Sequence, residues 1–171
     1  MTHRKLLMAT AILASAAVTA CSDTTAPRKD PGVSPVAAKR AAVVATVNGG
    51  GTAVMQPAGV AQGRTAFGMG VKLLADGSAT GHFDCVDQHG GTFPGNIFGE
   101  VTSWRMEGTV VVLNVTGKLV SFPGGHPQDI SFTVKIQQFG GAGVGRWTLE
   151  VGGTLFCVEL LTSGQIVYRP A

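Results

Sequence analysis

Two histidines and two aspartates lie close together in the sequence, and side chains of these types can ligate a metal ion. They are His82, Asp84, Asp87 and His89. His82 and Asp84 would share one side of a β-strand. Their spacing matches no specific metal site, and alternating polar residues on a solvated strand explain them equally well. We therefore predict no metal site.

Cys85 and Cys157 could form a structural disulfide in an oxidising compartment. The apolar residues at alternate positions from 156 to 160 argue against this pairing, because burying them would turn Cys157 and Glu159 outward while Cys85 points inward. The bridge then requires a β-bulge, or Leu155 and Cys157 as the inward pair. We predict the Cys85–Cys157 disulfide, with two buried free thiols and a reactive cysteine as the alternatives.

Two loops carry similar motifs, each with a histidine nearby. They are Phe93-Pro94-Gly95 near His89 and Phe122-Pro123-Gly124 near His126. Between them we predict three strands, over residues 97–104, 109–115 and 118–122. An odd number of up-and-down strands places the loops at opposite ends, so we expect ordinary turns and no shared site.

Catalytic patterns are missing from the sequence. There is no G-x-S-x-G elbow for a nucleophilic serine. The glycine-rich run over residues 140–145 lacks the lysine and following helix of a phosphate-binding loop. Paired-carboxylate chemistry would need neighbouring acids, but the glutamates fall on different predicted elements: Glu100, Glu107, Glu150 and Glu159. We predict no catalytic residue and no cofactor; a hydrolase with an unrecognised site is the weakest alternative.

The amino-terminal segment has the order of a secretory signal. Basic Arg4-Lys5 precede an apolar run over residues 6–17, which leads into Val18-Thr19-Ala20-Cys21. This order resembles the lipobox of bacterial lipoproteins. The resemblance implies that Cys21 becomes the lipidated first residue and attaches the protein to membrane lipid in the cell envelope, on the extracytoplasmic side, in the periplasm or at the cell surface.

We expect three segments: a signal peptide over residues 1–20, a lipid-anchored linker over 21–42, and an antiparallel β domain over 43–171. The linker contains Pro27, Pro31 and Pro35 and no apolar periodicity, which is typical of an extended spacer. From Arg64 onward there are seven Lys and Arg residues and eight Asp and Glu residues, which gives a net charge of −1. This near-neutral balance argues against a nucleic-acid partner.

The clearest strand pair begins at Phe67. Phe67, Met69, Val71 and Leu73 form one apolar face before the Asp76-Gly77 turn. A two-residue loop would mix His82 and Asp84 into that face. A three-residue loop over 75–77, with Gly77 left-handed, instead predicts three cross-strand pairs: Leu73 with Ala79, Met69 with Phe83, and Phe67 with Cys85.

Other strands are predicted over residues 41–47, 52–55, 130–139, 146–151, 154–161 and 165–169. Glycine makes up 25 of the 171 residues, and we place several strand breaks at glycines. Strands with one apolar side and no helix between them indicate an all-β fold. We predict a single antiparallel β-sandwich or up-and-down β-barrel of about eight to ten strands.

Residues 63–67, together with the Asp76-Gly77 turn and the strand up to Phe83, resemble uncharacterised β-rich domains of secreted bacterial proteins. This resemblance implies a fold class and a location, and no activity. We predict a binding or structural module. The alternative is a lipocalin-like barrel that carries a small apolar ligand in a cavity lined by core residues: Phe67, Met69, Phe132, Ile136 and Trp147.

Overall fold

The computed structural model describes residues 41–88 and 91–171, and its regular elements in these two ranges are all β-strands. The predicted signal peptide, Cys21 and His89 lie outside the described residues, as does the linker except for its last two positions. The strands are β1 (Val43–Met55), β2 (Arg64–Leu74), β3 (Ala79–Asp87), β4 (Gly95–Glu107), β5 (Val110–Ser121), β6 (Gln128–Gln138), β7 (Gly140–Gly141), β8 (Arg146–Val151) and β9 (Thr154–Pro170). Within the described ranges, no helix has the length and hydropathy needed to cross a membrane.

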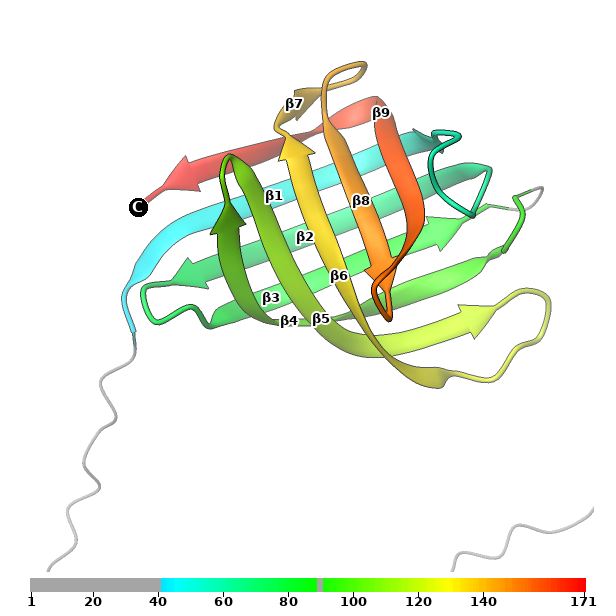
Figure 1. Ribbon diagram of the computed structural model, residues 1–171, viewed down its shortest axis with the longest axis horizontal. Helices are drawn as coiled ribbons and strands as arrows, with labels where there is room; N and C mark the ends of the chain where they lie inside the picture. The colour runs from blue at the N-terminus through cyan, green and yellow to red at the C-terminus, as the bar shows by residue number, and fades with distance from the viewer. Residues whose placement is uncertain (1–40, 89–90) are drawn as a thin grey trace, which may run out of the picture. The chain divides into compact units, whose positions relative to one another are not determined.

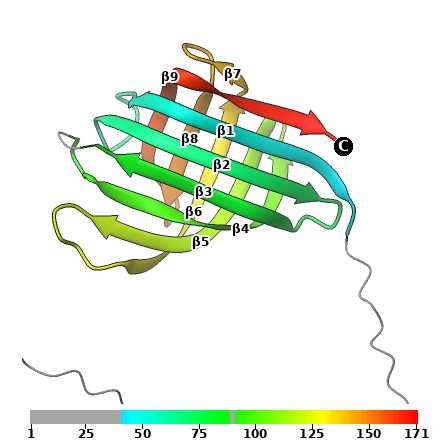
Figure 2. The same cartoon turned by 180° about the vertical axis from the view of Figure 1, so that it is seen from behind.

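The strands close into an antiparallel barrel, because β1 pairs with both β2 and β9. Val47, for example, lies opposite Val71 of β2 on one side and Tyr168 of β9 on the other. Each remaining long strand pairs with its neighbours in chain order, and the two-residue β7 pairs with β9 (Figures 1 and 2). The all-β prediction is confirmed. Of the two architectures predicted, sandwich and barrel, the structure is the barrel.

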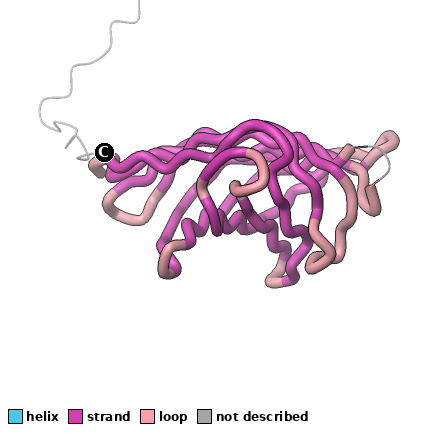
Figure 3. The backbone as a smooth tube through the Cα atoms, turned by 90° about the horizontal axis from the view of Figure 1, so that it is seen from above, coloured by secondary structure: helices cyan, strands magenta, loops and turns pink. Residues whose placement is uncertain are grey.

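The barrel has two layers whose strands cross steeply. Figure 1 shows β1, β2 and β3 side by side in one layer, with β6, β8 and the first part of β9 crossing in front of them. The long strands β4, β5 and β9 bend from one layer into the other (Figure 1), and the view from above shows that the strands of the barrel are strongly curved (Figure 3). Closure therefore depends on bends within single strands.

A pair of facing glycines lies in the bent part of β4 and β5. Gly99 and Gly117 are cross-strand partners, and both lie on the side of their strands that faces the barrel interior. A Cβ atom on Gly117 would overlap the carbonyl oxygen of Phe98, and one on Gly99 would overlap that of Thr116. Only glycine leaves room for this close backbone approach. The predicted break between residues 115 and 118 is therefore wrong, and β5 is one continuous strand.

A second glycine pair lies where β9 bends against β1. Gly51 is the partner of Gly164, whose φ is +76°. A Cβ on Gly164 would overlap the carbonyl oxygen of Gly50. Two further predicted breaks, at residues 49–51 and between 161 and 165, are consequently wrong, since β1 and β9 each continue through them.

The β2–β3 register agrees with the sequence-based prediction. Leu73 pairs with Ala79, Met69 with Phe83, and Phe67 with Cys85. The turn closes with the Gly77 amide donating to the Leu74 carbonyl at 3.1 Å, and Gly77 has a φ of +83°. The three-residue loop with left-handed Gly77 is thus confirmed.

Four aromatic rings fill the middle of the barrel. Trp147 lies with its ring centroid 5.5 Å from that of Phe67 and 5.3 Å from that of Phe83. Phe83 also contacts Phe132, at 5.9 Å between centroids. All four side chains are buried. Tilted and edge-to-face contacts of this kind add to the free energy gained by burying apolar surface.

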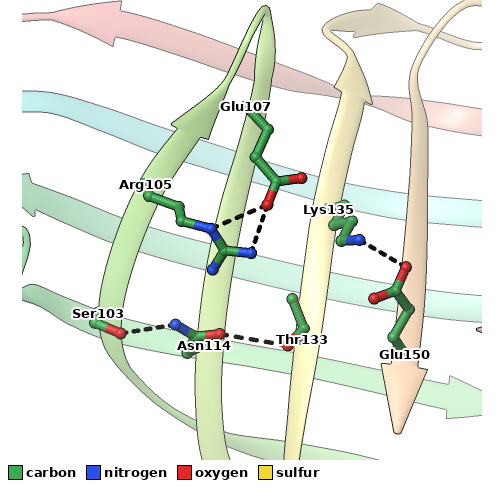
Figure 4. A network of polar contacts seen from close by, with 7 residues as sticks. All are labelled: Ser103, Arg105, Glu107, Asn114, Thr133, Lys135 and Glu150. Atoms are coloured by element: carbon green, nitrogen blue, oxygen red, sulfur yellow. Dashed lines mark hydrogen bonds and ion pairs between the residues drawn. The ribbon is translucent and has the colours of Figure 1, made fainter. Parts of the chain in front are cut away.

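The outer face of β4, β5, β6 and β8 carries polar contacts (Figure 4). Asn114 Nδ2 donates to Ser103 Oγ at 2.9 Å, and Thr133 Oγ1 donates to Asn114 Oδ1 at 3.3 Å. Lys135 Nζ lies 2.8 Å from the Glu150 carboxylate. Contacts this close to solvent contribute at most about 1 kcal/mol each, so they mark the solvent side of these strands more than they stabilise the fold.

The glycine contacts predict a difference between two small substitutions. Gly117→Ala should lower the free energy of unfolding by about 2 kcal/mol or more, because its Cβ must displace backbone atoms. Gly68→Ala is the matched control, since a Cβ there would meet no atom within 4 Å. It should leave stability within about 1 kcal/mol of the original. Urea unfolding followed by circular dichroism measures both, and equal losses would contradict the proposed role of Gly117.

Candidate functional site

A cavity of about 360 Å³ lies at one end of the barrel. This is the end with the β1–β2, β3–β4, β5–β6 and β8–β9 connections. Its lining is mainly apolar and comes from seven strands and two loops: Met55, Cys85, Asp87, Thr92, Phe93, Pro94, Gly95, Ile97, Leu119, Ser121, Phe122, Ile130, Leu149, Val151, Phe156 and Cys157.

The two phenylalanine-proline loops meet at this cavity. The Phe122 amide donates to the Pro94 carbonyl at 2.8 Å, and Phe93, Pro94 and Phe122 all line the space. We expected the loops at opposite ends of the fold, and this was wrong. Only two strands, β4 and β5, separate them, because Gly117 continues β5 instead of ending it.

The cavity lies above the aromatic core, not within it. The residues expected to line a ligand cavity, Phe67, Met69, Phe132, Ile136 and Trp147, are buried in the core and none of them lines this one. At the rim, Phe93 packs against Phe156 with ring centroids 5.5 Å apart. Phe93 is nevertheless 51% exposed, so an apolar surface borders the solvent at the entrance.

Both cysteines face the barrel interior: Cys85 through the regular register of β3, and Cys157 because β9 contains a bulge. Leu149 pairs with Cys157 but Glu150 pairs with Leu155, which leaves Phe156 as the extra residue. The bulge reverses the expected orientation, so that Cys157 and Glu159 point inward. Both thiols are buried and free in this structure, which therefore does not show the predicted Cys85–Cys157 disulfide. Burial raises the pKa of both well above the usual range, which makes them poor nucleophiles.

Two carboxylates and a hydroxyl lie beside the thiols inside the barrel. Glu159 and Thr65 are fully buried, and Asp87 is 6% exposed. Thr65 and Asp87 are cross-strand partners on β2 and β3. We call Thr65, Cys85, Asp87, Cys157 and Glu159 the interior polar cluster. Sequence analysis missed Glu159, because one bulged residue in β9 decides which side chains face inward.

Burial controls the charge of the two acids. Removal from water raises the pKa of Asp87 to about 6, partly offset by the nearby Phe93 backbone amide. It raises the pKa of Glu159 to about 7, and the charge of Asp87 adds to this while the Thr65 hydroxyl and Cys157 thiol oppose it. No carboxylate oxygen of either residue has a hydrogen bond of ordinary geometry to a described residue. The interior therefore holds two poorly compensated acids.

The structure separates the residues with metal-ligand side chains. His82 and Asp84 are on the outer face of β3, where His82 pairs with Glu100 of β4. Asp87 faces the interior and lines the cavity. Within residues 41–88 and 91–171, no three His, Cys, Asp or Glu side chains are grouped to hold a metal ion.

Comparisons with protein families, curated proteins and solved structures found no match for this chain. The function must therefore be argued from the geometry of the cavity and its lining.

The raised pKa of Glu159 predicts a pH-dependent stability. The folded state keeps this proton up to about pH 7, whereas the unfolded chain loses it near its ordinary value of 4.5. Unfolding thus releases a proton between these values, and stability falls as pH rises through that window. Glu159→Gln should remove this cost and be more stable than the original at pH 8, by on the order of 2 kcal/mol.

At pH 4 the two proteins should differ little, because Glu159 is then protonated in both folded and unfolded chains. Urea unfolding at each pH gives the comparison. Glu100→Gln is the control, since Glu100 is exposed on the outer face and should give no pH-dependent gain. A stability difference between Glu159→Gln and the original that is the same at pH 4 and pH 8 would contradict the assignment.

Proposed function

We propose that this barrel is a non-catalytic binding module that holds a small, mainly apolar ligand in the cavity at its end. The supporting observation is the cavity itself, of about 360 Å³. Small-molecule sites span about 300–1,000 Å³ and combine apolar walls with a few polar groups. The lining has this composition, with Asp87 as its acidic group.

The entrance supports the same proposal. Phe93 and Phe156 form an aromatic pair at the rim, and Phe93 keeps about half of its surface in water. A ligand seated between these rings and the Phe122 loop would cover apolar surface that is otherwise hydrated. A ligand-carrier role follows from this more directly than a structural role, which does not need a cavity.

Filling the cavity should abolish ligand binding. Leu119→Trp places an indole into the space that Leu119 lines, and should weaken binding of octanol, a neutral apolar probe, by about tenfold or more. Val144→Trp is the control, because Val144 is exposed and lies away from the cavity lining. Calorimetric titration measures the affinities, and circular dichroism checks folding. Failure of octanol to bind the original protein, or equal binding to Leu119→Trp, would refute the carrier role.

We also propose that Cys21 carries a lipid that holds the protein in the cell envelope. The support is the order of basic residues, apolar run and Val18-Thr19-Ala20-Cys21. Cys21→Ser should move the protein out of the membrane fraction, because the thiol that accepts the lipid is lost. Ser34→Ala, in the linker, should leave fractionation unchanged. A Cys21→Ser protein that stays in the membrane fraction would contradict lipidation.

The Cys85–Cys157 disulfide stays a proposal tied to this location. Both thiols line the same cavity, and the charge of Cys157 is one of the causes that raise the pKa of Cys85. An oxidising envelope would favour their pairing. Because both thiols are buried, we infer that the bond forms while the chain folds.

A further inference from the structure

Asp87 is the acidic residue in the cavity wall. Only 6% of the residue is exposed, and it lines the cavity from the end of β3. The backbones of Gly63 and Gly91 pack against the carboxylate; a Cβ atom on Gly63 would lie 2.9 Å from Asp87 Oδ1, and one on Gly91 would overlap that oxygen. Glycines at these two positions therefore leave room for the acid in the cavity wall.

The described part of the barrel offers Asp87 no positive partner. None of the described Lys, Arg or His side chains is buried. Glu159, an interior acid whose pKa is raised by the charge of Asp87, has the same sign, and the two thiols are neutral or negative. Burying an uncompensated carboxylate costs free energy. A cation bound beside Asp87 would offset part of that cost.

We propose that Asp87 makes the cavity selective for a ligand that joins an apolar body to a protonated amine. This inference rests on the proposed ligand-binding function and adds the chemistry of the ligand's head group. An ammonium group would bond to the Asp87 carboxylate, while the rest of the ligand contacts Ile97, Leu119 and Phe122.

Other head groups would bind less well for identifiable reasons. A hydroxyl can donate one hydrogen bond to Asp87 but brings no charge to compensate the acid. A carboxylate would add a third negative charge beside Asp87 and Glu159. With the apolar chain held constant, the expected order of affinity is therefore amine, alcohol, then carboxylate.

Three probes with the same chain test this order: octylamine, octanol and octanoate. At pH 8, where Asp87 is ionised, calorimetric titration of the full-length protein should show octylamine binding about tenfold or more tightly than octanol, and octanoate most weakly. Asp87→Asn should remove the preference for the amine while still binding octanol. Asp84→Asn is the matched control, because Asp84 lies on the outer side of β3. It should keep the preference.

A pH series on the original protein covers the case in which Asp87→Asn does not fold. Among the described residues, the titratable groups around the head-group position are Asp87, Glu159, Cys85 and Cys157. The advantage of octylamine over octanol should shrink between pH 8 and pH 5 as both acids take up protons.

The possible results separate the two proposals. Equal affinities for octylamine and octanol at pH 8, or an amine preference that persists in Asp87→Asn, would overturn the head-group inference and leave the carrier role intact. If none of the three probes binds, the carrier role itself fails.

Discussion

Closure of this barrel depends on backbone approach at two glycine pairs. At Gly99–Gly117 and Gly51–Gly164, a side chain on either residue would overlap a carbonyl oxygen of the facing strand. The strands can therefore bend from one layer into the other while the ladder continues through each glycine pair (Figure 1). Continuous ladders matter because an interrupted strand would expose unpaired backbone groups at the corner.

The continuity of β5 through its glycine also determines where the cavity lies. Because β5 continues through Gly117, only two strands separate the β3–β4 and β5–β6 loops, and both loops reach the same end of the barrel. Below them the interior is filled by the rings around Trp147. The space left between the loops and these rings is apolar on most sides, so the few polar groups that face it have a strong influence on what can bind.

Two further polar side chains face the interior because of the bulge at Phe156. One extra residue in β9 turns Cys157 and Glu159 inward beside Asp87. In this water-poor setting the two acids hold their protons to higher pH than usual, and each lacks a positive partner among the described side chains. The result is a barrel with an acidic group in the wall of an apolar cavity, at some cost in stability near neutral pH.

The alternation of residue types determined the all-β class, the apolar face of β2 and the β2–β3 register, because side-chain direction and turn length are local properties. Only the tertiary structure decided three other features: the continuity of β1, β5 and β9 through glycine, the meeting of the two loops, and the inward position of Glu159. In sequence, a glycine that ends a strand looks the same as one that lets two strands touch. The distinction lies in the facing strand, and a single bulged residue likewise reveals itself only through its partner.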